Sequence, residues 1–220
     1  MSTKRSYHDG CAAAQALDLV GERWTLLVVR ELLFGPRRFT DLRSGLPAIS
    51  PNVLSQRLDE LEQSAIVRRH KLPPPANTWV YELTEWGREL DVVITELGRW
   101  GARSPFLKRD LELSIHSLVM SLRTMFQGET ARGVHARYEL RMGDYAFDAV
   151  IDDGTFEVSC TPAGNADAVI TADPASLAAV VYDGRPLAEA IAAGEVSVDG
   201  ALDAVERFRG YFALPDRAPA

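Results

Sequence analysis

The stretch ISPNVLSQRLDELEQS, residues 49–64, predicts a helix with one face for the protein and one face for an outside partner. Ser50 is a favourable N-cap and Pro51 suits the first helical position. An apolar stripe at helical spacing is formed by Leu54, Leu58 and Leu61. The opposite face carries polar groups, namely Asn52, Ser55, Gln56, Asp59 and Gln63. Because amides and hydroxyls can hydrogen-bond base edges in a major groove, this face predicts DNA contact.

The flanking sequence favours DNA contact over the alternative, an ordinary amphipathic surface helix. Residues 39–46 predict a short helix that Gly45 and Pro47 end, giving a helix, a turn and a helix. Residues 66–71 and 79–83 are strand-like and flank the loop LPPPANT, which indicates a β-hairpin. A helix-turn-helix followed by such a hairpin is a winged helix.

Five motifs in the first half of the chain occur together in one family. They are Cys11, LDLVGERW (17–24), RELLFGPRRF (30–39), LSQRLDELE (54–62) and YELTEWG (81–87). This set resembles the HxlR family of bacterial transcription regulators. The resemblance implies a dimeric winged-helix protein that binds DNA, with residues 50–64 as its recognition helix.

The expected DNA contacts divide into groups that read bases and groups that hold phosphates. We expect Asn52, Ser55 and Gln56 to read bases. We expect Arg37, Arg38 and Arg57 to bind phosphates of the DNA backbone. The full predicted set is Arg37, Arg38, Ser50, Asn52, Ser55, Gln56, Arg57, Arg69 and Lys71. For the first two arginines the alternative is a solvated loop. The hairpin tip contains no Lys or Arg, whereas family members often have a basic residue near it.

Residues 85–102 predict a further helix, which Thr84 can cap. Its apolar stripe consists of Trp86, Leu90, Val93, Ile94, Leu97 and Trp100. The stripe is longer than a small winged domain needs, so we expect it to pair with a second copy. A two-fold dimer would read a palindromic operator in double-stranded DNA, with half-sites about one helical turn apart. The alternative is that this helix docks on the C-terminal half of its own chain.

Cys11 is a candidate redox residue. In the family a cysteine at this position begins the first helix, and some members sense oxidants or electrophiles with it. A thiol near a helix N-terminus can have a lowered pKa and react readily. Here Ala12 follows, where the family commonly has proline, and the alternative is an inert, half-buried thiol.

The second half of the chain changes from helical to strand periodicity. Residues 111–127 predict a helix, and four strand-like runs follow: HARYELRM (135–142), YAFDAVID (145–152), TFEVSCT (155–161) and ADAVITA (166–172). We expect antiparallel strands joined by hairpin turns. Asp173-Pro174 and Pro186 begin two helices, residues 195–199 form a short strand, residues 201–212 form a last helix, and residues 214–220 are frayed.

Residues 167–212, DAVITADPASLAAVVYDGRPLAEAIAAGEVSVDGALDAVERFRGYF, resemble the sterol carrier protein fold. The resemblance implies a small α+β domain that encloses an apolar cavity for lipid-like ligands. The expected lining is Leu118, Leu122, Phe126, Tyr138, Leu140, Phe147, Val158 and Val180. The alternative for each of these residues is a plain, filled core.

The predicted fold class is therefore α+β, with two domains of different charge. Residues 1–103 form the winged-helix DNA-binding and dimerisation domain, 104–110 a linker, and 111–220 the sterol-carrier-like domain. The chain carries a net charge of −7, but residues 1–103 hold 14 Lys/Arg against 13 Asp/Glu and residues 104–220 hold 10 against 18. The acidity thus lies in the second half, which suggests two units with different partners, or merely a soluble acidic domain.

The predicted function is a homodimeric transcription regulator, controlled by a small apolar ligand in the C-terminal domain. Phosphate loops, zinc-protease motifs and serine elbows are missing from the sequence, so we expect no enzyme, catalytic residue, cofactor or metal. No run reaches the ~18 apolar residues of a membrane span, and two cysteines are too few for a disulfide framework, so we expect a cytoplasmic protein without a membrane partner. Two alternatives stay open. One is a lipid carrier or small-ligand enzyme that uses the winged helix only for assembly, and the other is a redox regulator based on Cys11.

Overall fold

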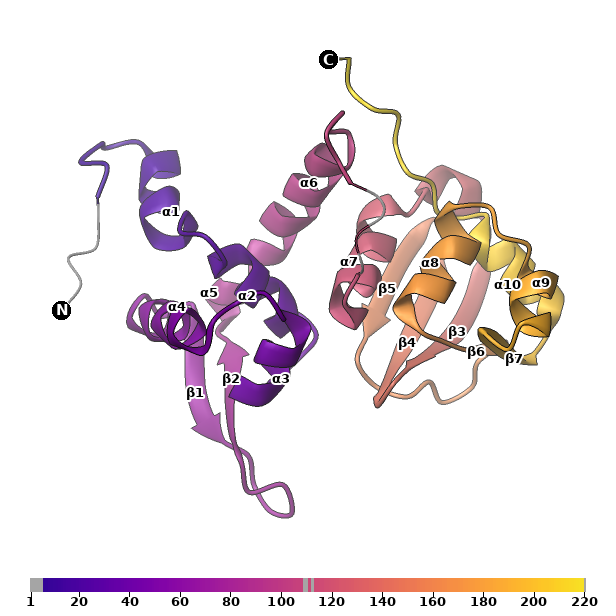
Figure 1. The fold of residues 1–220 in the computed structure, drawn as a ribbon, viewed down its shortest axis with the longest axis horizontal. Helices are drawn as coiled ribbons and strands as arrows, with labels where there is room; N and C mark the ends of the chain where they lie inside the picture. The colour runs from indigo at the N-terminus through magenta and orange to yellow at the C-terminus, as the bar shows by residue number, and fades with distance from the viewer. Residues whose placement is uncertain (1–5, 109–110, 112, 220) are drawn as a thin grey trace. The chain divides into compact units, whose positions relative to one another are not determined.

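The computed structural model describes residues 6–108, 111 and 113–219 (Figure 1). The chain divides into two compact units, Met1–Ile94 and Thr95–Ala220. The predicted domain bounds of 1–103, 104–110 and 111–220 stay predictions, and residues 109 and 110 of the expected linker lie outside the described residues.

The first unit is a bundle of short helices followed by a hairpin. Its elements, including a last helix that continues beyond residue 94, are α1 (Ala12–Val20), α2 (Thr25–Leu32), α3 (Phe39–Gly45), α4 (Pro51–Gln63), β1 (Val67–Lys71), β2 (Trp79–Leu83), α5 (Glu85–Arg88) and α6 (Leu90–Ala102). β1 and β2 pair in antiparallel register from Val67↔Leu83 to Lys71↔Trp79. Arg37 adds a backbone bridge to Tyr81 on the other edge of β2. The predicted helix-turn-helix with a winged-helix-like hairpin is confirmed.

The start and orientation of α4 follow from its own residues. The Ser50 hydroxyl accepts a hydrogen bond of 3.3 Å from the backbone N–H of Val53, as expected of an N-cap. All three leucines of the predicted stripe are 0% exposed. Burying a leucine side chain contributes about 1.5–3 kcal/mol, so the stripe holds α4 against the unit and turns the polar face outward.

The predicted helix over residues 85–102 is interrupted, and this corrects the expectation. The Glu89 N–H donates to Trp86 O, three residues back, so the regular i→i−4 ladder stops between α5 and α6. Thr84 begins α5 by accepting from the Gly87 N–H at 3.0 Å. Gly87 packs against the backbone of Ile66, the residue before β1. A Cβ at position 87 would overlap the Ile66 carbonyl oxygen.

The second unit is a five-stranded sheet with helices over one face (Figure 1). Beyond the end of α6, its elements are α7 (Ile115–Met125), a short 3₁₀ turn (Gly128–Ala131), β3 (His135–Met142), β4 (Tyr145–Asp152), β5 (Thr155–Ser159), β6 (Ala168–Ala172), α8 (Pro174–Tyr182), α9 (Leu187–Ala192), β7 (Val196–Gly200) and α10 (Leu202–Arg209). The strand order is β5-β4-β3-β6-β7.

The pairing of β6 differs from the expected run of antiparallel hairpins. β3, β4 and β5 are antiparallel, as predicted, but β6 crosses to the free edge of β3 and pairs with it in parallel, in the register Tyr138↔Ala168. β7 then pairs with β6 in antiparallel orientation. The segment between β5 and β6 is therefore a crossover connection, which strand periodicity alone does not distinguish from a hairpin.

Helix ends in the second unit are set by local contacts. α7 begins after Ser114, whose hydroxyl accepts from the Ser117 N–H, rather than at residue 111 as predicted. α10 ends before residue 212, because Phe212 leaves the helix and forms a backbone bridge with Phe126. The tail expected to be frayed makes at least one hydrogen bond, from the Ala218 N–H to Arg103 O at 2.7 Å.

Across the described ranges, none of the helices has both the length and the apolar composition needed to cross a membrane.

The fit of Gly87 predicts a specific loss of stability. Gly87→Ala should lower the free energy of unfolding by about 1–3 kcal/mol, since the new methyl group meets a backbone carbonyl that cannot move freely. The matched control is Gly101→Ala in α6, where a Cβ has no heavy atom within 4 Å. Urea denaturation of both variants measures the difference. Equal stability of the two variants would contradict the assigned packing.

Candidate nucleic-acid interface

The exposed face of α4 carries the residues predicted to read bases. Asn52, Ser55 and Gln56 are exposed on the side opposite the buried leucines, and Ser50 is exposed at the N-cap. The Gln56 amide Nε2 donates to Glu60 Oε1 at 2.9 Å, an i,i+4 bond that holds the side chain along the helix. α4 therefore presents a row of hydrogen-bonding groups on a helix fixed from below.

Two of the arginines predicted to hold phosphates are buried. The side chain of Arg57 is 8% exposed and pairs with Glu60 at 3.0 Å and Glu22 at 3.5 Å. Arg37 is 7% exposed, beside its backbone bridge to β2. Both side chains are largely covered in this structure, and their contact with phosphates stays a prediction. Arg38 is exposed, and its backbone N–H donates to Asp41.

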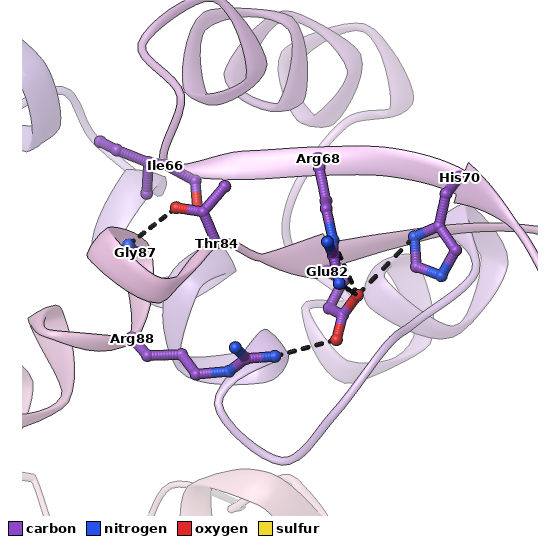
Figure 2. Close-up of polar contacts among 7 residues, drawn as sticks. All are labelled: Ile66, Arg68, His70, Glu82, Thr84, Gly87 and Arg88. Carbon is purple, nitrogen blue, oxygen red and sulfur yellow. Dashed lines mark hydrogen bonds and ion pairs between the residues drawn. The ribbon is translucent and has the colours of Figure 1, made fainter.

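On one face of the hairpin a single carboxylate binds two arginines (Figure 2). Glu82 Oε2 accepts from Arg68 Nε at 3.0 Å and Nη2 at 2.7 Å, and Oε1 accepts from Arg88 Nη2 at 2.9 Å. His70 Nδ1 lies 3.8 Å from Glu82 Oε2. The Glu82 side chain is only 14% exposed, so β1, β2 and the end of α5 are joined by charge-assisted contacts.

The other face of the hairpin combines cations with aromatic rings. Arg69 and Lys71, both predicted DNA contacts, alternate with Arg68 and His70 along β1 and are exposed. The Arg69 guanidinium lies 5.0 Å from the Trp79 ring centroid and 5.7 Å from that of Tyr81.

Charges on α4 act on this second face. Burial is the main cause that raises the pKa of Tyr81, while Arg69 lowers it and Asp59 and Glu62 of α4 raise it. Tyr81 is therefore within electrostatic reach of the charges on α4.

Sequence reasoning missed Trp79 and Glu82 as parts of this region. Both could have been found by writing out the hairpin register, which pairs Lys71 with Trp79 and Arg68 with Glu82. Once the pairs are known, alternation assigns each side chain to a face.

α6 exposes an apolar row at the positions predicted for dimerisation. Val93, Leu97 and Trp100 recur at i, i+4 and i+7, and Trp100 is 75% exposed. Val92 on the neighbouring row is exposed as well, whereas Ile94 is buried. Ordinary helices of a single domain turn such a row inward, so this row is available to a partner.

The predicted ligand-lining residues lie between the sheet and its helices. Most are buried, namely Leu118, Leu122, Tyr138, Leu140, Phe147 and Val180, while Phe126 and Val158 are half-buried. The Tyr138 hydroxyl donates to Ala204 O at 3.1 Å and its ring packs 4.7 Å from Phe208. These contacts belong to core packing, and a role in ligand binding stays a prediction.

Cys11 occupies the N-cap of α1 and is exposed. The backbone N–H groups of Ala13 and Ala14 at the start of α1 lower the pKa of its thiol, because they favour the thiolate. Within the described part of the chain, no three His, Cys, Asp or Glu side chains come together as metal ligands.

Comparisons with known proteins match the same half of the chain. Residues 19–108 match the family described as HxlR-like helix-turn-helix. HTH-type transcriptional regulator YodB of Bacillus subtilis is 41% identical over 85 residues, which are 39% of this chain and 76% of that protein. The regulator YvaP of the same organism is 37% identical over 86 residues, 39% of this chain and 80% of that protein. The solved structure of reduced YodB is 36% identical, with a TM-score of 0.40, and covers 44% of this chain and 97% of that chain.

The lowered pKa of Cys11 predicts its reactivity. In a Cys160→Ser variant, alkylation of Cys11 by iodoacetamide should set in at a lower pH in the folded protein than in urea, since the backbone donors exist only in the folded helix. The unfolded sample serves as the control for the same residue. Identical pH profiles in the two states would contradict the assigned effect of these backbone donors.

Proposed function

Since the chain belongs to the HxlR-like helix-turn-helix family, we propose that it is a transcription regulator that binds operator DNA as a homodimer. The observation that carries the proposal is the polar, exposed face of α4 above a fully buried leucine stripe. Both relatives named above are called transcriptional regulators, which supports a non-enzymatic role for this half of the chain.

In the proposed complex α4 enters the major groove. Asn52, Ser55 and Gln56 then face base edges, where amides and hydroxyls discriminate base pairs. Arg38 is the exposed cation nearest the start of α3 and holds a backbone phosphate. Ser50 stays at the helix start, where its hydroxyl caps α4. Phosphate contacts supply affinity and orientation, and base contacts supply sequence preference.

The homodimer is proposed from the exposed row on α6. A two-fold axis pairs this row with itself, because the same surface serves both copies of a symmetric dimer. Leu17 of α1 is also exposed and is available to extend the contact. Burying Trp100 and its neighbours removes large apolar side chains from water, which is the main driving force for association.

Control by a small apolar ligand is proposed for the second unit. Support comes from its sequence resemblance and from a sheet whose apolar residues face a layer of helices. Such control requires the ligand to bind the DNA-competent and incompetent dimers with different affinity, because equally tight binding to both shifts nothing. Operator titration with and without a fatty acid as probe measures this difference.

A redox-responsive regulator is the second candidate function. The observation that favours it is the exposed Cys11 thiol, whose pKa is lowered by backbone donors at the start of α1. Its thiolate is a nucleophile toward oxidants and electrophiles. Cys11→Ser separates the two candidates, because electrophiles should no longer release DNA from this variant if the thiol is the sensor.

Base reading by α4 predicts how two substitutions differ. Gln56→Ala should weaken operator binding by about 1–3 kcal/mol and loosen sequence preference. Arg38→Ala should weaken all DNA alike and flatten the slope of log K against log salt by about one. Fluorescence anisotropy with operator and scrambled duplexes measures both effects.

The control variants replace a glutamine and an arginine that lie outside the proposed DNA-binding face. Gln15→Ala is exposed in α1, away from the polar face of α4, and Arg132→Ala lies in the second unit. Both should bind as the wild type does. Wild-type behaviour of Gln56→Ala and Arg38→Ala would show that the assigned face is wrong.

The α6 row predicts the oligomeric state. Trp100→Glu should convert the dimer to a monomer at micromolar concentration, because a charge replaces the most exposed ring of the row. Light scattering coupled to size exclusion measures the mass. Glu96→Gln on the same helix is the control and should remain dimeric. A dimeric Trp100→Glu would move the interface elsewhere.

A further inference from the structure

The hairpin separates its two adjacent arginines onto opposite faces. Arg68 pairs with Glu82 in the strand register, and Arg69 pairs with Tyr81. Because successive side chains of a strand point to opposite sides, the two guanidinium groups meet different surroundings. The hairpin therefore has a Glu82 face and a Trp79 face, which differ in what they offer a phosphate.

On the Glu82 face the cations are already engaged. Arg68 places two nitrogens on one carboxylate oxygen, and Arg88 occupies the other oxygen (Figure 2). A carboxylate that accepts from two arginines takes the donors that a phosphate would use. A DNA phosphate on this face would have to compete with Glu82, whose side chain is 14% exposed, for these nitrogens.

On the Trp79 face the cation rests on rings. Arg69 lies over Trp79 and Tyr81, and no ion pair of Arg69 is found among the residues that the structure describes. When a guanidinium stacks on an aromatic ring, the ring covers only the planar face of the guanidinium. The N–H donors at the edge of the guanidinium remain available to another group. Trp79 is 53% exposed, so the stack stands at the surface beside Lys71.

The residues of this face fit a nucleic-acid partner. Tyr81, over whose ring Arg69 lies, is within electrostatic reach of Asp59 and Glu62 on α4. The loop at the hairpin tip, LPPPANT, has no Lys or Arg, so Arg69 and Lys71 are the cations on this face of the hairpin that lie toward the tip. These two cations are therefore the ones on this face that could contact the phosphates of a duplex bound to α4.

We propose that Trp79 is a positioning residue that holds the Arg69 guanidinium toward a backbone phosphate of the operator, so that the Trp79 face of the hairpin, and not the Glu82 face, meets DNA. The inference rests on the proposed function. The stack limits the rotamers of a long side chain before DNA arrives, which lowers the ordering cost of binding.

The test compares the loss of Arg69 with the loss of the Arg68–Glu82 ion pair. Arg69→Ala should lower the slope of log K against log salt by about 0.9, the loss of one phosphate contact. The control is the double variant Arg68→Gln/Glu82→Gln, which removes the pair at constant net charge and should leave both slope and operator affinity unchanged. An equal fall of the slope in both would overturn the face assignment.

The role of the ring is tested separately. Trp79→Leu should weaken operator binding about two- to fivefold, whereas Trp79→Phe should retain most of the affinity, because phenylalanine keeps an aromatic face. In an Arg69→Ala background Trp79→Leu should have no further effect. An unchanged loss in that background would show that Trp79 acts independently of Arg69. Thermal unfolding of both variants should match the wild type, since the ring is half exposed.

The outcomes separate this inference from the proposed function. Failure of the wild-type chain to bind its own promoter, with Gln56→Ala indistinguishable from it, overturns both. A loss with Gln56→Ala but none with Arg69→Ala or Trp79→Leu overturns only the positioning role.

Discussion

The burial of three leucines under α4 decides which side chains of the first unit remain available to a partner. A helix repeats every 3.6 residues, so a stripe at positions 54, 58 and 61 that is held inward turns the amides and hydroxyls between them outward. The cap at Ser50 fixes where that repeat begins. A shift of the start by one residue would rotate the polar row by about 100° and bury part of it.

In the sheets, side chains alternate between the two faces with a period of two residues, and this alternation decides which partner each one meets. In the hairpin it assigns Arg68 to a carboxylate and Arg69 to an aromatic ring. In the second unit Tyr138 and Leu140 point to the helices, while their neighbours on β3 carry charge to the opposite face. There Arg137 pairs with Asp148 and Arg141 with Glu139, so the face without helices is stabilised by ion pairs rather than by apolar burial.

Sequence patterns predicted the helices and strands well. They did not predict contacts between residues that are far apart in the sequence. The strands at 135–142 and 145–152 have the predicted bounds, because a Gly-Asp turn and clear alternation mark both ends. Arg57 is buried and pairs with Glu22 from the turn between α1 and α2, whereas residue type alone favours exposure. Glu82 was missed for the same reason, since its role appears only when β1 and β2 are paired. The exposed polar face of α4 could be predicted because one helix contains all of it.

The parallel pairing of β6 with β3 has a consequence for biosynthesis. Arg137 donates to Asp167, 30 residues further along, so the central strand keeps one unpaired edge until that segment has left the ribosome. An open edge of this kind is a template for unwanted pairing with other chains. The nascent second unit therefore passes through a stage that favours aggregation, and a chain cut before residue 168 would remain in it.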